Sequence, residues 1–210
     1  IAIKLTSSDV GAYNILLTLT GLTTFLLLNL NKVFAPAISK LHSEKSFIEL
    51  NILYKKTTFL FNLFAIPLAV IIAIFSDEIL GLYTFEMLVY KKYLFYMLVG
   101  GILNLAAGSS GTFMLMAGLE KQNLKIQLIR ALLLIFLSLL FIPIIGLLSV
   151  VGLYVISNLF VNGAQVIYIA KYLKISPFSK ELFFIFGLTI LAMYFAINQE
   201  FVFQIFHFIT

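Results

Sequence analysis

Four polar side chains follow one another at helical spacing within a long apolar stretch near residue 160. Spacings of four, four and three residues place them on one face of an α-helix: Tyr154, Asn158, Asn162 and Gln165. Lipid offers amides and hydroxyls no hydrogen-bond partner, so this face is expected to look toward other helices or a wet cavity. It could hydrogen-bond neighbouring helices or line the path of a substrate.

A cation and a further amide are candidates for the same pathway. Arg130 lies about two turns into a helix that is expected to begin near Asn123. It could snorkel back to the membrane surface, or project into a central cavity and meet an anion. Asn104 belongs to the stretch GGILNLAAGSSG at 100–111, where small residues recur every three or four positions. That spacing favours close helix packing, with a pathway lining as the alternative.

The sequence offers little for catalysis. It has no cysteine and only two histidines, His42 and His207, neither of them near a second candidate metal ligand. It contains no nucleotide-binding glycine loop and no Ser/His/Asp set, and none of its nine acidic residues falls inside an expected membrane span. We therefore expect a protein that is not an enzyme and uses no cofactor or metal. The basic residues form no compact patch with interleaved aromatics, so no nucleic-acid partner is expected either.

The elements that position these residues are expected to be membrane helices. Hydrophobic residues make up 62% of the chain and charged residues 11%, against roughly 25% charged residues in an ordinary soluble domain. Runs without Asp, Glu, Lys or Arg occupy 10–31, 57–76, 93–119, 131–170 and 182–199. Each is at or near the roughly 20 residues that span a bilayer, and 131–170 is long enough for two spans. A tight hairpin at Pro143, Gly146 and Ser149 would join those two, which makes six transmembrane helices.

The cations predict how such a bundle would sit in its membrane, because Lys and Arg concentrate on the cytoplasmic side. With the segment between the first two spans on that side, eleven cations fall there and three opposite: Lys32, Lys40, Lys45, Lys55, Lys56, Lys121, Lys125, Arg130, Lys171, Lys174 and Lys180, against Lys4, Lys91 and Lys92. The segment 36–56 is too polar to span. It is expected to be helical and to lie against the membrane. A capping box of Ser46 and Glu49 would start a helix that continues through Lys56 into the second span.

Four short patterns, in order along the chain, carry a family resemblance. They are DVGAYN at 9–14, FAPAISKL at 34–41, GLEKQN at 118–123 and IPIIGLLSVVGLYVIS at 142–157. Together they resemble the C-terminal half of bacterial polysaccharide flippases, the O-antigen type transporters of the multidrug/oligosaccharidyl-lipid/polysaccharide superfamily. In that family a Pro, a Gly and a second Gly three residues later form the outside hairpin before an Ile-Ser pair. The matching residues are Pro143, Gly146, Ile156 and Ser157, with Ser149 in place of the second Gly and Ile145 where an aromatic often precedes the first.

The resemblance implies an all-α integral membrane protein, a bundle of about six transmembrane helices that forms half of an inverted two-lobe transporter. Residues 1–172 would hold the end of the family's seventh helix and helices eight to twelve. Residues 173–210 would hold an additional helix at 181–198, with 201–210 beginning another. The amino-terminal half of the same protein, which would complete the cavity, is expected to lie outside this chain.

The function that the resemblance implies is translocation of a polyprenyl-diphosphate-linked oligosaccharide across the bacterial inner membrane, for O-antigen of lipopolysaccharide or for capsule. The expected partners are that lipid-linked oligosaccharide and membrane lipid. Asn158, Asn162 and Gln165 could hydrogen-bond sugars and Arg130 could attract the diphosphate, while the lipid tail stays in the bilayer. Two alternatives remain: a drug or cation antiporter of the same superfamily, and a membrane scaffold that recruits glycosyltransferases.

Overall fold

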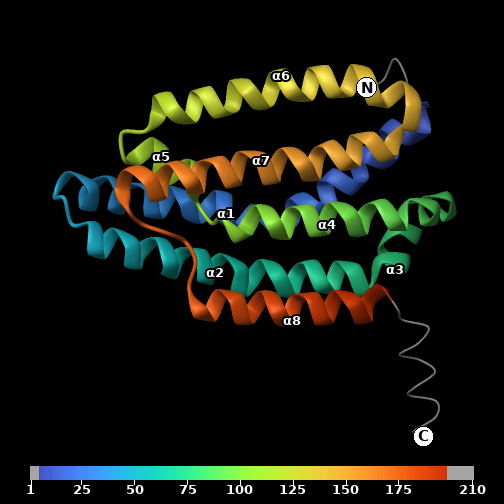
Figure 1. Ribbon diagram of the computed structural model, residues 1–210. Coiled ribbons are helices and arrows are strands. Elements are labelled where there is room, and N and C mark those ends of the chain that lie inside the picture. Colours follow the sequence, from blue (N-terminus) through green and yellow to red (C-terminus); the bar gives the residue numbers. More distant parts are fainter. Residues whose placement is uncertain (1–4, 198–210) are drawn as a thin grey trace, which may run out of the picture.

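The computed structural model describes residues 5–197, apart from the side chains of 26 and 193–197. Within that range the chain forms helices joined by short connections (Figure 1). In chain order they are α1 (Ser7–Ser43), α2 (Phe47–Ile74), α3 (Ser76–Gly81), the 3₁₀-helix η1 (Phe85–Tyr90), α4 (Lys91–Ala106), α5 (Ser110–Met116), α6 (Glu120–Ile145), α7 (Leu147–Leu173) and α8 (Lys180–Ile197).

Five helical segments of the described range are long and apolar enough to cross a membrane: Ser7–Ser43, Phe47–Ile74, Phe85–Met116, Glu120–Ile145 and Leu147–Leu173. They correspond to the first five expected spans, so the predicted all-α membrane bundle is confirmed. The sixth expected span, 181–198, coincides with α8 up to the limit of the described residues. With 18 residues, α8 is about 27 Å long, slightly less than the roughly 30 Å hydrocarbon core of a bilayer. The helix expected at 201–210 lies outside the described residues.

The bundle has a packed centre and a helix on each side of it. In the centre, α4 packs against α1, α2 and α7, and α1 packs against α2. On one side α6 covers α7, and on the other α8 covers α2 (Figure 1). Of the five spans, α6 has the smallest share of buried residues. Its exposed leucine, isoleucine and phenylalanine side chains suit contact with a bilayer.

One residue makes the hairpin between the fourth and fifth spans, at the place predicted. α6 ends at Ile145 and α7 begins at Leu147, so the reversal falls on Gly146, with φ +56° and ψ −134°. A residue with a Cβ is strained in this conformation, which explains the glycine. The Ser149 hydroxyl donates to the Gly146 carbonyl oxygen at 2.6 Å, so the turn satisfies this backbone group without a charged residue.

The segment 36–56 is helical, and its second part continues into the second span, as predicted; its first part, predicted as an interfacial turn, is instead the end of the first bundle helix. α1 continues through Pro36 to its last turn, and α2 begins shortly after. Ile38 is fully buried in a cluster that also holds Leu50 of α2. The prediction of an interfacial segment was wrong because these apolar side chains find partners in the bundle, not in lipid.

The start of α2 was predicted correctly, but not the way it is capped. The helix begins directly after Ser46, yet the Ser46 side chain makes no capping hydrogen bond. The backbone explains this: the Ser46 N–H closes the end of α1 on the Leu41 carbonyl oxygen at 2.9 Å, after Lys45 has adopted a positive φ of 57°. A C-terminal motif of α1 therefore fixes the turn, not a capping box of α2.

The third span is broken, although its sequence predicts one continuous helix. α4 ends at Ala106 and α5 begins at Ser110, and Gly108 between them has a φ of +59°. A Cβ on Gly108 would lie 2.0 Å from the hydroxyl oxygen of Thr58 in α2. Glycine is therefore required here both by the backbone and by the space, and at this position the small-residue repeat serves close packing.

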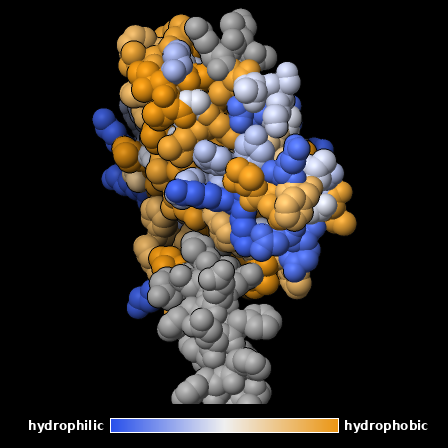
Figure 2. Space-filling view, turned by 90° about the vertical axis from the view of Figure 1, so that its right-hand side faces the viewer, coloured by the Kyte–Doolittle hydropathy of each residue, from blue (hydrophilic) through white to orange (hydrophobic). Residues whose placement is uncertain are grey.

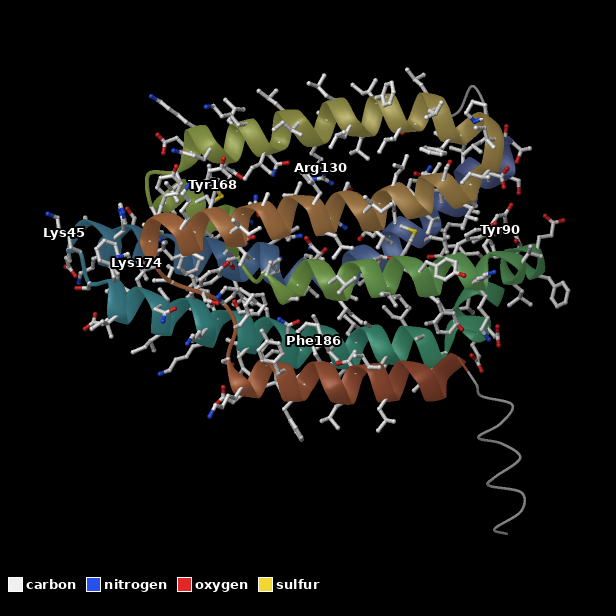
Figure 3. All side chains as sticks on the ribbon, viewed as in Figure 1. Lys45, Tyr90, Arg130, Tyr168, Lys174 and Phe186 are labelled. Atoms are coloured by element: carbon white, nitrogen blue, oxygen red, sulfur yellow. The ribbon has the colours of Figure 1, made fainter. Side chains whose placement is uncertain are left out.

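Charged residues gather at the two ends of the bundle. One end carries the turn between α1 and α2 and the end of α7, with Lys45 and Lys174 (Figure 3). We refer to it as the lysine-rich end. Tyr90 marks the opposite end, where Lys91 pairs with Asp77 at 2.6 Å. Figure 2 looks onto this Tyr90 end and shows hydrophilic side chains gathered beside hydrophobic surface.

Candidate functional site

Side chains from α2 satisfy the backbone that the break between α4 and α5 leaves without helical partners. The Tyr54 hydroxyl donates to the Ala107 carbonyl oxygen at 2.9 Å, and the Asn62 amide donates to the Leu105 carbonyl oxygen at 2.9 Å. Both side chains are fully buried. Irregular backbone is tolerated inside a membrane protein where such partners replace the lost helical bonds. The break is therefore a built feature of the fold, held by α2.

The predicted polar face of α7 hydrogen-bonds with three other helices. Asn162 donates from Nδ2 to Oδ1 of Asn104 in α4 at 2.7 Å. Gln165 donates from Nε2 to Oδ1 of Asn123 in α6 at 2.8 Å, and accepts from the hydroxyl of Ser110 in α5 at 2.7 Å. We refer to these five residues as the amide network. It ties both parts of the broken span, and α6, to α7.

The amide network is largely saturated, and its centre is closed to solvent, whereas Asn104 and Asn162 are half-buried. Gln165 is only 3% exposed and Ser110 only 1% exposed. Asn162 uses its Nδ2 a second time, donating to the Asn158 carbonyl oxygen at 2.8 Å. Hydrogen bonds between membrane helices are worth on average about 0.6 kcal/mol each and at most about 1.7. Of the two interpretations of this face, hydrogen bonding between helices is what the geometry of Asn162 and Gln165 shows.

Sequence reasoning missed several partners of the broken span. Besides Tyr54 and Asn62 of α2, the hydroxyl of Ser109 donates to the side-chain oxygen of Asn31 in α1. A signal was present, because Asn62 is an isolated amide within an otherwise apolar span. Such amides need partners inside the protein. The glycine-rich stretch at 100–111 is where backbone carbonyl groups and hydroxyl groups would supply these partners.

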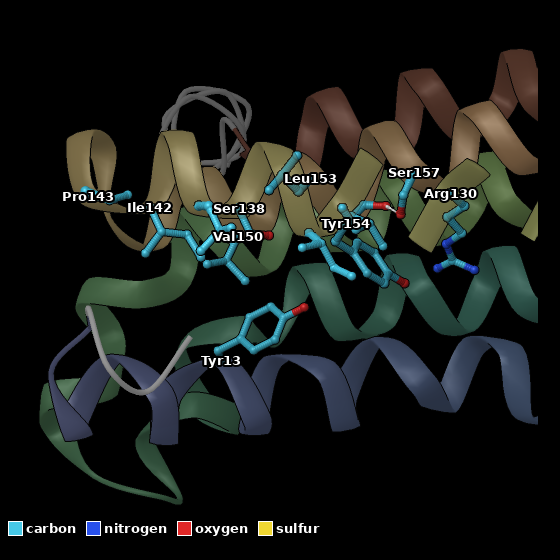
Figure 4. Close-up of a pocket in the computed structure, with 12 residues that line it drawn as sticks. Tyr13, Arg130, Ser138, Ile142, Pro143, Val150, Leu153, Tyr154 and Ser157 are labelled. Atoms are coloured by element: carbon cyan, nitrogen blue, oxygen red, sulfur yellow. Dashed lines mark hydrogen bonds between the residues drawn. The ribbon is translucent and has the colours of Figure 1, made fainter. Parts of the chain in front are cut away.

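A separate groove of about 550 Å³ runs between α1, α6 and α7 (Figure 4). Tyr13 lines it from α1, Arg130 and Ser138 from α6, and Tyr154 and Ser157 from α7. Apolar side chains form the rest of its wall. Its volume falls within the roughly 300–1,000 Å³ of sites that hold small molecules. We refer to it as the Arg130 groove.

Arg130 gives the groove a positive charge. Its side chain lies along the wall near Tyr154 (Figure 4), in the middle of the bundle and away from Lys45 and Lys174 (Figure 3). The Nε atom is buried and has no hydrogen-bond partner among the described residues. Arginine cannot deprotonate in a protein, and a buried charge without a partner is unfavourable. The arrangement therefore leaves room for an anion beside Arg130.

The six residues predicted to line one pathway thus lie in two places. Arg130 and Tyr154 line the groove, and the amide network contains Asn104, Asn162 and Gln165. Asn158 is buried on α7 between the two. The helical spacing correctly placed these side chains on one face of α7. That face is long enough to serve a groove at one end and a network at the other.

The fold and the site together define a class of protein. It is an all-α, multi-pass membrane bundle with a broken central span, an amide network that holds the break, and a cationic groove beside its most exposed helix. Comparison of the chain with known protein families, with curated proteins and with solved structures finds no match. The function is therefore argued from the groove and the network themselves.

Proposed function

We propose that the protein moves a polyprenyl-diphosphate-linked oligosaccharide across the bacterial inner membrane for the synthesis of surface polysaccharide. The observation that carries the proposal is the Arg130 groove, in which a half-buried arginine has no partner for its Nε within residues 5–197 and faces a cavity of about 550 Å³. The ordered short patterns from DVGAYN to IPIIGLLSVVGLYVIS support it, through their resemblance to polysaccharide flippases.

The chemistry of the groove suits a phosphorylated sugar lipid. A guanidinium group binds phosphate oxygens through paired N–H···O bonds that are stronger than neutral hydrogen bonds. The hydroxyls of Tyr154, Ser157 and Ser138 lie on the same walls and can donate to or accept from sugar hydroxyls. The described lining contains no carboxylate, the group that a drug or cation antiporter would use. The groove therefore favours an anionic substrate.

In this proposal the two polar regions have different tasks. The amide network keeps the broken span attached to α7, so that the helices around the groove move as one body. Arg130 and the hydroxyls near it meet the substrate. Transport would follow alternating access, in which this bundle rocks against a second lobe around a site near the middle of the membrane.

Deletion of the intact gene from its host tests the proposal. We expect the lipid-linked oligosaccharide to accumulate on the cytoplasmic leaflet while surface glycan disappears, and the intact gene to restore the glycan. Normal surface glycan with raised sensitivity to cationic drugs would support an antiporter instead. Loss of glycan without any accumulated lipid-linked oligosaccharide would support a scaffold for glycosyltransferases.

Two variants on α6 then test the groove itself. Arg130→Gln removes the charge and keeps a polar side chain, so we expect about a tenfold or larger loss of surface glycan, in line with the strength of a hydrogen bond to a charged group. Leu132→Ala is the matched control, because Leu132 is 68% exposed and lies outside the groove. Unchanged glycan with a fully inserted Arg130→Gln protein would remove Arg130 from the proposal.

A further inference from the structure

The α6 wall of the Arg130 groove is one helix face that runs along much of the span. It is formed by Arg130, Leu134, Ile135, Ser138, Leu139, Ile142 and Pro143. After Arg130 these positions come as pairs of neighbouring residues, and each pair lies four residues after the one before it. This spacing places them on a single face of an α-helix. From Arg130 to Pro143 the wall rises about 20 Å. The groove therefore suits an occupant that is long and narrow.

The groove changes character along this length. At the Arg130 end, α7 presents Tyr154 and Ser157 (Figure 4). Toward Pro143, α7 presents Val150 and Leu153, and α6 presents mainly aliphatic side chains. The groove is thus charged and polar at one end and hydrocarbon over most of the rest.

We propose that the groove binds a lipid lengthwise, with the lipid phosphate on Arg130 and the hydrocarbon chain along the apolar wall toward Pro143. The inference rests on the proposed function and deepens it, because it places the chain of the substrate against the protein instead of free in the bilayer. Charge complementarity selects this occupant. An apolar helix would fill the wall but leave the guanidinium without an anion, whereas a lipid phosphate meets both requirements.

The direction of the groove agrees with the direction of a lipid in a bilayer. α6 begins at Glu120 near the lysine-rich end and ends at Ile145 near the Tyr90 end, so Arg130 is the groove residue of α6 nearest the lysine-rich end. A lipid of the leaflet at the lysine-rich end has its phosphate on that side and its chain pointing away from it, in the same sense as the groove. Arg130 lies about 15 Å from the start of α6, so the phosphate would move inward along the helix but the lipid would not have to turn over.

The hydrocarbon chain of the lipid is expected to determine where the lipid lies more than how tightly it binds. A hydrocarbon chain is already in an apolar medium before it enters the groove, so its transfer has little hydrophobic driving force. The phosphate provides most of the binding free energy through Arg130. The test must therefore report where the chain lies, and not only whether the lipid binds.

Photolabelling of the intact protein in phosphatidylcholine nanodiscs reports the position of the chain. The probe is a polyprenyl phosphate that carries a diazirine on its chain, and the adducts are mapped by mass spectrometry. Relative to a diazirine phosphatidylcholine, we expect about tenfold more labelling at Leu139 and Ile142 than at Leu132, a ratio that corresponds to modest binding selectivity. An uncharged polyprenol probe should lose this preference, because it has no phosphate for Arg130.

Three variants sharpen the result. Ser138→Trp fills the groove and should lower labelling at Ile142 about tenfold, whereas Leu132→Trp adds the same ring outside the groove and should not change it. If the Ser138→Trp protein shows no cooperative unfolding transition and is therefore not folded, Leu139→Trp replaces it. Leu139 is 74% exposed and tolerates a larger ring. Equal labelling of groove and outward positions would overturn the inference. If Arg130→Gln still abolished transport in that case, the proposed function would stand without it.

Discussion

The amide network and the Arg130 groove share α6 and α7 but leave their polar groups in opposite states. In the network, Gln165 is 3% exposed, and both its amide nitrogen and its oxygen have partners closer than 2.9 Å. In the groove, the buried Nε of Arg130 has no partner among the described residues. Buried polar groups in folded proteins are normally satisfied. Hydrogen bonding within the fold therefore explains why the network residues are polar, whereas a ligand would explain why an arginine lines the groove.

This contrast separates stability from function within one pair of helices. Network residues should respond to substitution through the free energy of unfolding, because each one is a partner of others. Groove residues should respond through transport. The comparison can be tested on one scale, the free energy of unfolding measured by SDS titration in mixed micelles.

The largest loss of stability is expected at the break that the network holds. Gly108→Ala would place a Cβ 2.0 Å from the Thr58 hydroxyl oxygen, in a backbone conformation that disfavours side chains. Strain and overpacking together predict a loss of about 3 kcal/mol or more. Gly163→Ala in α7 is the control, because a Cβ there meets nothing within 4 Å and should be neutral or slightly stabilising. A loss no larger than that of the control would mean that α2 is not packed on the break.

The next largest effect is expected from a central residue of the network. Gln165→Leu leaves the side-chain oxygen of Asn123 buried without its donor and leaves Ser110 with only the longer bond to Asn162 at 3.3 Å, so we expect a loss of about 2 kcal/mol. The double variant with Asn123→Leu removes one of the orphaned groups and should recover part of the loss. Simple addition of the two losses would show that the bond between Gln165 and Asn123 contributes nothing.

The sequence predicted the spans well for a physical reason. A membrane helix must exclude charge over about 20 residues, so the charge-free runs around α1, α2, α6 and α7 locate these helices without knowledge of their neighbours. The hairpin at Gly146 was equally accessible, because Pro143, Gly146 and Ser149 divide a run that is too long for one span. Both inferences depend on local composition alone.

The break and the pairing of the amides were not predictable in the same way. GGILNLAAGSSG is as apolar as a continuous helix, and the positive φ of Gly108 makes sense only once Thr58 and Tyr54 of α2 lie against it. Helical spacing placed Asn162 and Gln165 on one face but could not identify the neighbour. For the same reason the sequence left two interpretations of Arg130, and it could not show that α6 packs against α7 so that Arg130 lines a groove.

A smaller loss is expected at the edge of the break. Tyr54→Phe keeps the ring that stacks on Phe113 and removes only the hydroxyl bond to the Ala107 carbonyl oxygen. One buried neutral hydrogen bond predicts a loss of about 1 kcal/mol. Tyr172→Phe serves as the control, because Tyr172 is 52% exposed and its hydroxyl should be free to meet solvent. Equal effects of the two substitutions would mean that the Tyr54 hydroxyl does not support the break.

The smallest change in stability is expected where the change in transport is largest. Arg130→Leu removes a half-buried charge whose Nε has no partner in the part of the chain that the structure describes, so the free energy of unfolding should stay within about 0.5 kcal/mol or rise. The same variant should transport no lipid-linked oligosaccharide, because the groove then lacks its positive charge. If Arg130 does not stabilise the fold and is unfavourable to bury, its role is to bind a ligand. A loss of more than about 1 kcal/mol would instead make Arg130 a structural residue, and would remove the distinction between the groove and the network.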